Sequence, residues 1–348
     1  MLDELIESVI KEDASDLHLA EGREPIIRVA GQLIPLTGKG TLTAANLEDF
    51  LNVFLSKESK ELFERDRQVD FSYNYKDKAR FRGNVFIRQS KTSIALRNIP
   101  SNIKTLKELQ LPDTLEIFTR KKQGFFLAVG PTGNGKTTTL AAMVEMINQN
   151  RLEHIITIED PVEYVYEPKK SIIDQREVRT DTPDFSTALH GIFRQDVDVA
   201  VIGEMRTPET MSVAVTAAET GHLVFSTLHT NNAAQTIDRI IDSFPANQQD
   251  QIRLQLAGSL AGIFSIRLIP RVSGGLVPAY ELLIANGAVR NLIREGRTHE
   301  IGTVVETGSN EGMIDLNRSL TNLVQAGEIT VENAYIHSVN QKTLEKML

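Results

Sequence analysis

The chain has 348 residues, of which 41% are hydrophobic and 24% charged, so it is long enough for about two folded domains. It contains no cysteine, which excludes disulfides and thiolate metal sites, and we expect no structural metal. A formal net charge of −8 argues against a nucleic-acid partner, because such binding relies on Lys and Arg side chains that neutralise phosphates.

Neither the hydropathy pattern nor the first residues are typical of a membrane or secreted protein. The longest apolar runs, such as 125–129 and 199–202, are far shorter than the roughly 20 residues that span a bilayer. The opening sequence mixes acidic residues into an amphipathic pattern, unlike a secretory signal. We therefore expect a cytoplasmic protein.

Residues 1–98 are predicted to form a small α/β domain. An amphipathic helix is followed by a hairpin around Gly31, by a helix capped by Thr43, and by three alternating strands with a turn at 76–78. Such alternation predicts an antiparallel sheet. Residues 99–112, with Pro100 and a polar segment, are predicted to be a linker.

Residues 113–348 show a different pattern, in which strand, loop and helix alternate. Apolar strands are predicted in the segments FFLAV, IITI, DVAVIG and LVFST. This alternation indicates a parallel sheet with helices on its faces. Beyond residue 231 we expect mainly helices, apart from a strand at VPAYELLIA.

The segment GPTGNGKT at 130–137 satisfies the phosphate-loop pattern G-x-x-x-x-G-K-[ST], between an apolar strand and a helix-forming stretch. In such a loop the backbone N–H groups and the helix N-terminus cradle phosphates. Lys136 is then placed to reach the β and γ phosphates, and the Thr137 hydroxyl to ligate Mg²⁺. The predicted ATP-binding residues are Gly130, Pro131, Thr132, Gly133, Asn134, Gly135, Lys136, Thr137 and Thr138.

Hydrolysis also requires a group that orients water and an acid that holds the metal. The strand IITI leads into Glu159 and Glu163, and the strand DVAVIG leads into Glu204. The carboxyl ends of parallel strands meet at one edge of a sheet, so these carboxylates are predicted to lie near the phosphate loop. Glu204 is the candidate partner of Mg²⁺, directly or through a water molecule.

Two histidines bracket the predicted strand LVFST, and we expect His222 and His229 to contact the γ-phosphate region or a subunit boundary. The first domain carries a set of arginines on its predicted strands. These arginines form either a solvated basic face or a group from which one arginine neutralises transition-state charge at the site of a neighbouring subunit. The set comprises Arg80, Arg82, Arg88 and Arg97.

Several segments together resemble the PilT family of type IV pilus retraction ATPases, within the secretion ATPase superfamily. They are GPTGNGKTTTLAAM, ITIEDPVEY, DQREV, IFRQDVDVAVIGEMR, ETGHLVFSTLHTNNAAQTIDRIIDSFP and AVRNLIRE, and the resemblance covers essentially the whole chain. It implies a PAS-like N-terminal domain, a RecA-like P-loop ATPase domain and a homohexamer with ATP sites between subunits. It also implies Mg-ATP hydrolysis that powers pilus retraction and twitching motility.

The implied partners are an inner-membrane platform protein, the pilus machinery and a retraction paralogue, so the protein would lie at the inner face of the cell membrane. By the same resemblance, Lys136 and Thr137 match the Walker A residues. The other implied site residues are the catalytic Glu163, the Walker B Glu204, the histidine-box residues His222 and His229, and the trans-acting arginines Arg82 and Arg97.

The segment AVRNLIRE is expected to couple hydrolysis to retraction, since it resembles a segment tied to retraction in this family. Its members are Ala288, Val289, Arg290, Asn291, Leu292, Ile293, Arg294 and Glu295. The spacing of Val289, Leu292 and Ile293 predicts the apolar stripe of a short helix. The polar face of this helix is expected to carry Arg290, Asn291, Arg294 and Glu295. Three departures from the family pattern, at Gln123, Thr207 and the stretch 265–268, are also compatible with an accessory PilU-type paralogue.

Alternative functions share the phosphate loop. A pilus-assembly or type II secretion ATPase usually carries a tetracysteine insertion and a longer N-terminal region, and this sequence has neither. A nucleotide-dependent scaffold would bind ATP without turnover, which the retained Glu163 and Glu204 disfavour. A DNA-translocating ring is disfavoured by the acidic charge balance.

Overall fold

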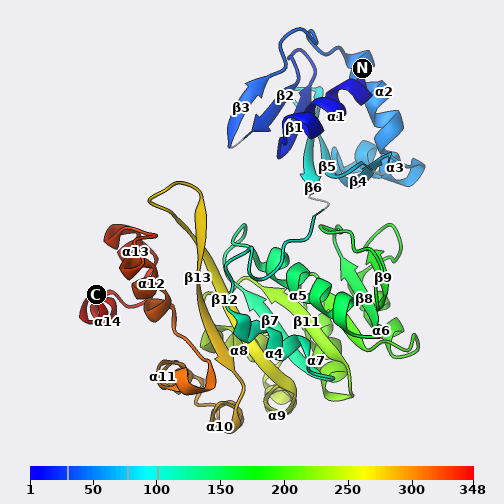
Figure 1. The fold of residues 1–348 in the computed structure, drawn as a ribbon. Helices are drawn as coiled ribbons and strands as arrows, with labels where there is room; N and C mark the ends of the chain where they lie inside the picture. Colours follow the sequence, from blue (N-terminus) through cyan, green and yellow to red (C-terminus); the bar gives the residue numbers. More distant parts are fainter. Residues whose placement is uncertain (30, 77, 100–101) are drawn as a thin grey trace. The chain divides into compact units, whose positions relative to one another are not determined.

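The computed structural model describes residues 1–29, 31–76, 78–99 and 102–348. The chain forms two compact units, coloured along the sequence in Figure 1. The first contains Met1–Asn102 and the distant segment Pro161–Val165, and the second contains Ile103–Asp160 and Tyr166–Leu348. Asp77 in the predicted turn, and Pro100 and Ser101 in the predicted linker, lie outside the described residues.

The first unit contains a six-stranded antiparallel sheet in the order β3-β2-β1-β6-β5-β4. Its strands are β1 (Asp16–Ala20), β2 (Ile26–Val29), β3 (Gln32–Pro35), β4 (Gln68–Tyr75), β5 (Ala79–Arg88) and β6 (Lys91–Ile99), and its helices are α1 (Leu2–Lys11), α2 (Ala44–Phe54) and α3 (Lys57–Asp66). The predicted hairpin turns at Gly31, which has a φ of 84°. Thr43 caps α2 in a reciprocal pair with Asn46. The predicted antiparallel sheet is therefore confirmed.

The second unit contains a mixed seven-stranded sheet in the order β13-β12-β7-β11-β10-β8-β9. Its strands are β7 (Gly124–Val129), β8 (His154–Glu159), β9 (Ile172–Glu177), β10 (Val199–Ile202), β11 (Leu223–Leu228), β12 (Leu260–Pro270) and β13 (Leu276–Ile284). Among the pairs that the described strands of this sheet form, only β12–β13 is antiparallel. Every residue of β7, β10 and β11 is buried, as expected for parallel strands covered on both faces. The predicted α/β class is confirmed.

Helices connect and cover these strands in Figure 1. They are α4 (Glu116–Thr119), α5 (Lys136–Asn150), α6 (Phe185–Ile192), α7 (Pro208–Glu219), α8 (Ala233–Asp242), α9 (Ala246–Ser259), α10 (Gly287–Glu295), α11 (Ile301–Thr307), α12 (Leu316–Gln325), α13 (Val331–His337) and α14 (Gln341–Met347). Short 3-10 turns occur at η1 (Asp113–Leu115), η2 (Thr298–Glu300) and η3 (Gly308–Glu311). Among the described residues, no helix combines the length and apolarity needed to cross a membrane.

The sequence prediction missed two strands of this sheet, β9 and β12. The mainly polar sequence IIDQRE of β9 gives no strand signal. The stretch after residue 231 was expected to contain a single strand, which the structure confirms as β13, but LAGIFSIRLIP forms β12 instead of a helix. Seven consecutive residues of β12, from Leu260 to Ile266, are buried, so the strand lacks the alternation that marks a half-exposed strand. A fully buried strand cannot be distinguished from a buried helix by periodicity alone.

Candidate active site

The phosphate loop connects the C-terminal end of β7 with the N-terminus of α5. Gly130 has a φ of 143°, and a Cβ built on it would lie 2.3 Å from the carbonyl oxygen of Ile266 on β12. Any side chain at this position would therefore push β12 away from the loop. Gly135 immediately precedes α5 with a φ of 83°, a left-handed conformation that glycine adopts without steric cost. The loop conformation thus depends on glycine at both ends.

Lys136 is the first residue of α5, and its side chain folds back over the loop. The ammonium group donates hydrogen bonds to the carbonyl oxygens of Gly130 and Pro131, both at 2.9 Å. The residue is only 7% exposed. A buried cation beside a helix N-terminus attracts anions strongly, since both carry positive charge. The loop therefore has the chemistry of a phosphate site.

His229 follows β11 and lies between the phosphate loop and Glu204. Its Nδ1 is 3.3 Å from the Nζ of Lys136, and its Nε2 is 3.5 Å from the Oε2 of Glu204. Lys136 can only donate, so Nδ1 accepts, and in the neutral ring the proton is then on Nε2, directed at the carboxylate. The hydroxyl of Thr132 is 3.4 Å from the same Nδ1. The imidazole thus bridges the loop cation and an acidic group.

Glu204 is held at the end of β10 by contacts between neighbouring strands. The hydroxyl of Thr227 donates to the carbonyl oxygen of Gly203 at 2.6 Å, and that of Ser226 to Ile202 at 2.9 Å. The partly buried Glu204 also forms an ion pair with Arg206, whose pKa it raises. The sequence interpretation did not single out Arg206, although it lies two residues after Glu204 in the segment GEMR.

The two predicted carboxylates after β8 have different surroundings. Glu159 is buried in the second unit, where it accepts hydrogen bonds from the Thr157 hydroxyl at 2.6 Å and from Gln175 at 3.4 Å. Glu163 belongs to the segment Pro161–Val165 of the first unit, and its Oε1 is 3.9 Å from the Nη1 of Arg82. The first unit thus brings together a predicted catalytic glutamate and a predicted trans-acting arginine.

Arg97 is the direct cross-strand neighbour of Arg82, because β5 and β6 pair these two residues in register. Its Nε donates to the Oδ1 of Asp16 at 3.1 Å. Asp16 is also the residue directly opposite Arg97 in the pairing of β1 with β6. Side chains opposite each other on neighbouring strands are in contact range. The two predicted arginines therefore form one basic row, with a carboxylate beside each.

The structure does not bring His222 to the phosphate loop. This residue precedes β11, whose first residue Leu223 pairs with Gly124 at the start of β7. Six strand residues separate this edge of the sheet from the loop, a distance of about 20 Å. The Nδ1 of His222 is 3.0 Å from the carbonyl oxygen of Ala217, and its ring is perpendicular to that of Phe193. Within its own chain His222 therefore does not reach the phosphate loop, and its expected place at a subunit boundary stays a prediction.

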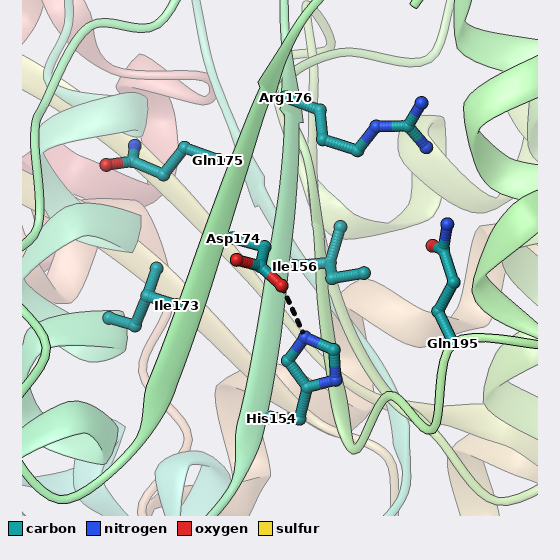
Figure 2. A pocket seen from close by; sticks show the side chains of 7 residues that line it. All are labelled: His154, Ile156, Ile173, Asp174, Gln175, Arg176 and Gln195. Carbon is teal, nitrogen blue, oxygen red and sulfur yellow. Dashed lines mark hydrogen bonds and ion pairs between the residues drawn. The ribbon is translucent and has the colours of Figure 1, made fainter. Parts of the chain in front are cut away.

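A separate open cleft of about 560 Å³ lies on β8 and β9, and Figure 2 shows the side chains that line it. His154 contacts Asp174 there, with 3.0 Å between the Nε2 and Oδ2 atoms. Burial disfavours the charged imidazole, but the Asp174 carboxylate outweighs it and raises the pKa of His154. The described residues that line this cleft include no predicted site residue and no glycine that could form a phosphate loop. We therefore assign the candidate active site to the loop at 130–137.

Comparison with known proteins places this geometry in a family. Residues 1–342 of the chain match the protein family described as "Type II/IV secretion system protein". The chain belongs to this family. It is 44% identical to the type IV pilus retraction ATPase PilT of Pseudomonas aeruginosa, over 95% of this chain and 96% of that protein. It is 36% identical to the type IV pilus ATPase PilU of the same organism, over 99% of this chain and 91% of that protein.

A solved structure of the pilus retraction motor PilT with bound ADP superposes with a TM-score of 0.92 at 45% identity. The match covers 99% of this chain and 98% of that chain. Because both sequences align along nearly their whole lengths, the similarity includes the first unit as well as the phosphate loop. The resemblance predicted from the sequence segments is therefore confirmed.

The segment Ala288–Glu295, which resembles a retraction segment of the family, lies within helix α10. Asn286 caps this helix, and its Oδ1 accepts the N–H of Val289 at 3.0 Å. The apolar stripe is buried, whereas Ala288, Asn291, Arg294 and Glu295 are exposed. The predicted division of this helix into an apolar and a polar face is confirmed for these residues.

Arg290 differs from the rest of that polar face. Its guanidinium is partly buried and donates to the carbonyl oxygens of Ala257 at 2.8 Å, of Leu260 at 2.8 Å and of Gly258. These carbonyls belong to the last turn of α9 and the residue after it, where helical carbonyls lack intrahelical partners. Arg290 thus joins α10 to α9, and its expected place on the solvent face is corrected.

Proposed function

We propose that this chain is a Mg-ATP-hydrolysing motor that powers the retraction of type IV pili and thereby twitching motility. The observation that carries this proposal is the contact of both His229 ring nitrogens with charged groups, Lys136 on one side and Glu204 on the other. Such a chain of groups joins a phosphate-binding cation to an acid that can serve a metal. The full-length similarity to PilT supports retraction as the work performed.

The residues around the loop fit bound ATP and Mg²⁺. The glycine backbone, the α5 N-terminus and Lys136 would bind the phosphates, and Thr137 and Glu204 would hold the metal, directly or through a water molecule. When bound, Mg²⁺ would neutralise charge on the phosphates. Glu163 would orient the attacking water and accept its proton. His229 would hold the side chains of Lys136 and Glu204 in fixed positions on either side of its ring. Its Nε2 proton would point toward Glu204.

We further propose that the protein acts as a homohexamer with residues 1–98 as the N-terminal domain, 99–112 as a linker and 113–348 as the ATPase domain. Arg82 and Arg97 would neutralise transition-state charge at the site of a neighbouring subunit. His222 lies away from the phosphate loop in its own chain and would contribute at a subunit boundary. The motor would work in the cytoplasm, on the inner-membrane platform protein of the pilus machinery, together with a retraction paralogue.

Two measurements test this proposal. Phosphate release by the wild type should depend on Mg²⁺ and should fall at least about a hundredfold in Lys136→Ala, since the loop cation is lost at the transferred phosphate. The exposed Lys121→Ala is the matched control and should hydrolyse normally. Wild-type turnover by Lys136→Ala would refute the phosphate-loop assignment.

Deletion of the gene then identifies the work that hydrolysis performs. Loss of retraction leaves excess pili on the cell, whereas loss of assembly leaves none. Excess pili that disappear when the wild-type chain is restored would support the proposed function. A deletion strain without pili would instead support the assembly ATPase. A deletion strain with normal pili and unchanged protein secretion would support an accessory scaffold.

A further inference from the structure

Glu281 on β13 contacts the loop that carries His229, although it lies more than 50 residues further along the chain. Its Oε1 accepts the backbone N–H of Ala233 at 2.7 Å. Ala233 is the first residue of α8, and the first four N–H groups of a helix have no partner within the helix. Glu281 therefore supplies the acceptor that this buried N–H group requires.

The strand next to Glu281 anchors the same loop a second time. Ser265 on β12 is the residue paired with Glu281, and its hydroxyl donates to the carbonyl oxygen of Asn231 at 2.9 Å. Two paired residues of the β12–β13 hairpin thus bind the loop at Asn231 and Ala233. These anchors flank the cap residue Asn232 and lie two and four residues after His229.

The hairpin also contacts the phosphate loop. The N–H of Leu268 donates to the Oδ1 of Asn134 at 2.8 Å, and the Ile266 carbonyl approaches Gly130 so closely that only glycine fits. The β12–β13 hairpin is therefore a common support for the two loops that carry Lys136 and His229. A support of this kind keeps the 3.3 Å contact between these side chains in place.

We infer that Glu281 is a positioning residue of the hydrolytic site, which holds His229 against Lys136 and Glu204 through the N-terminus of α8. This inference rests on the proposed function. Glu281 acts through Ala233 and its loop and has no role in binding phosphate. Its removal should therefore lower the turnover number while leaving the affinity for ATP unchanged.

The charges around Glu281 identify the substitution that should preserve its role. Burial, together with the nearby Asp315, raises the pKa of Glu281 to about 7, whereas the Ala233 N–H and Arg267 act in the opposite direction. Both the ionised and the protonated side chain present an oxygen to the Ala233 N–H group. Glutamine presents a similar oxygen at the same position, so Glu281→Gln should keep the loop in place, whereas Glu281→Ala should release it.

The test compares steady-state ATP hydrolysis with an NMR measurement of the His229 imidazole. The chain contains 7 histidines, and the His229 resonance is identified by its loss in His229→Asn. Glu281→Ala should lower kcat about tenfold with KM for ATP unchanged, because small displacements of catalytic groups carry costs of this order. It should also displace the His229 resonance. Glu281→Gln should restore both values.

Glu311→Ala is the matched control, since Glu311 accepts a hydrogen bond from Asn286, the cap of another helix. It should leave kcat and the His229 resonance unchanged. If Glu281→Ala does not fold, Ser265→Ala serves as a milder variant. It should displace the His229 resonance and lower kcat about threefold, which corresponds to the loss of about one neutral hydrogen bond. Lys136→Ala shows that the turnover belongs to the phosphate loop.

The inference is overturned if Glu281→Ala keeps the wild-type kcat and resonance, or if Glu281→Gln is as impaired as Glu281→Ala. For a Glu281→Ala chain that does not fold, an unchanged resonance in Ser265→Ala overturns it. A wild type that hydrolyses no ATP refutes the proposed function instead, and the His229 resonance then still tests the positioning role. The two ideas therefore fail in different measurements.

Discussion

Arg82 and Arg97 are paired directly across β5 and β6, so that two like charges face each other on one sheet of the first unit. Like charges in this arrangement repel. Here each has an acid nearby, Glu163 at 3.9 Å from Arg82 and Asp16 at 3.1 Å from Arg97. The acidic partners reduce the repulsion between the two arginines. The pair can therefore attract an anion that approaches from outside the unit.

This pairing leads to a prediction for mixed rings. When Arg97→Ala subunits are added to wild type, hydrolysis should fall more steeply than the fraction of variant, because each variant subunit would impair its neighbour's site. Phosphate release across a series of mixing ratios measures this. Arg28→Ala, which removes another arginine near Asp16, should give no steep loss. A loss strictly proportional to the Arg97→Ala fraction would mean that Arg97 acts only within its own subunit.

The two carboxylates after β8 should differ in function. Glu163→Gln should keep nucleotide affinity but lose turnover by at least about a hundredfold, since an amide cannot accept a proton from water. Glu159→Gln should retain most of its turnover, because Glu159 already accepts bonds from Thr157 and Gln175 in its own unit. Equilibrium binding of a fluorescent ATP analogue and phosphate release separate the two effects. The opposite result would identify Glu159 as the catalytic carboxylate.

The two histidines at the ends of β11 form a natural matched pair. His229→Asn should lower kcat by roughly tenfold to a hundredfold, the range expected for a displaced group in a catalytic arrangement. His222→Asn should hydrolyse ATP at close to the wild-type rate, because its ring contacts Ala217 and Phe193 at the other edge of the sheet. An equally large kcat loss in both variants would place His222 in the hydrolytic machinery after all.

The two arginines of α10 should have separable effects. Arg290→Ala should lower the free energy of unfolding by about 1 to 3 kcal/mol, because carbonyl oxygens of the α9 terminus lose their donor. Arg294→Ala removes an exposed side chain and should change stability by less than about 0.5 kcal/mol. It should also hydrolyse ATP normally but fail to restore twitching in a deletion strain. Full restoration of twitching by Arg294→Ala would show that its charge has no part in retraction.

Glu281 should make stability depend on pH. Its pKa is raised from 4.5 to about 7 in the folded chain, so the unfolded chain ionises first and the native state loses relative stability as the pH rises from about 4.5 to 7. Glu281→Gln removes this effect. It should therefore be more stable than wild type above pH 7, by at most about 3.5 kcal/mol at roughly 1.4 kcal/mol per pKa unit.

Denaturant unfolding at several pH values measures this difference. The advantage of Glu281→Gln should be largest above pH 7 and should vanish below about pH 4.5, where both folded and unfolded wild type carry a protonated Glu281. An advantage that is constant across this range would show that the ionised carboxylate is not disfavoured in the fold.

Sequence alone was sufficient for features that depend on a few neighbouring residues. Glycine at 130 and 135 followed by Lys136 predicts a phosphate loop, because its backbone geometry and charge are encoded within eight positions. The amphipathic stripe of α10 follows from helical spacing in the same way. The strands β7, β8, β10 and β11 also follow from local pattern, since each is a short apolar run, whereas the mainly polar β9 gives no such signal.

Tertiary structure decided which distant residues meet. Two histidines that bracket one strand look equivalent in the sequence, but a strand has two ends, and only His229 is at the end where the phosphate loop lies. Arg290 and Arg294 occupy similar positions on one helix, but only Arg290 lies against the end of α9. The bond from Ala233 to Glu281 depends on the β12–β13 hairpin, and β12 was itself hidden by its uniform burial. Local pattern specifies the elements, whereas the packing of distant strands and helices specifies which side chains share a site.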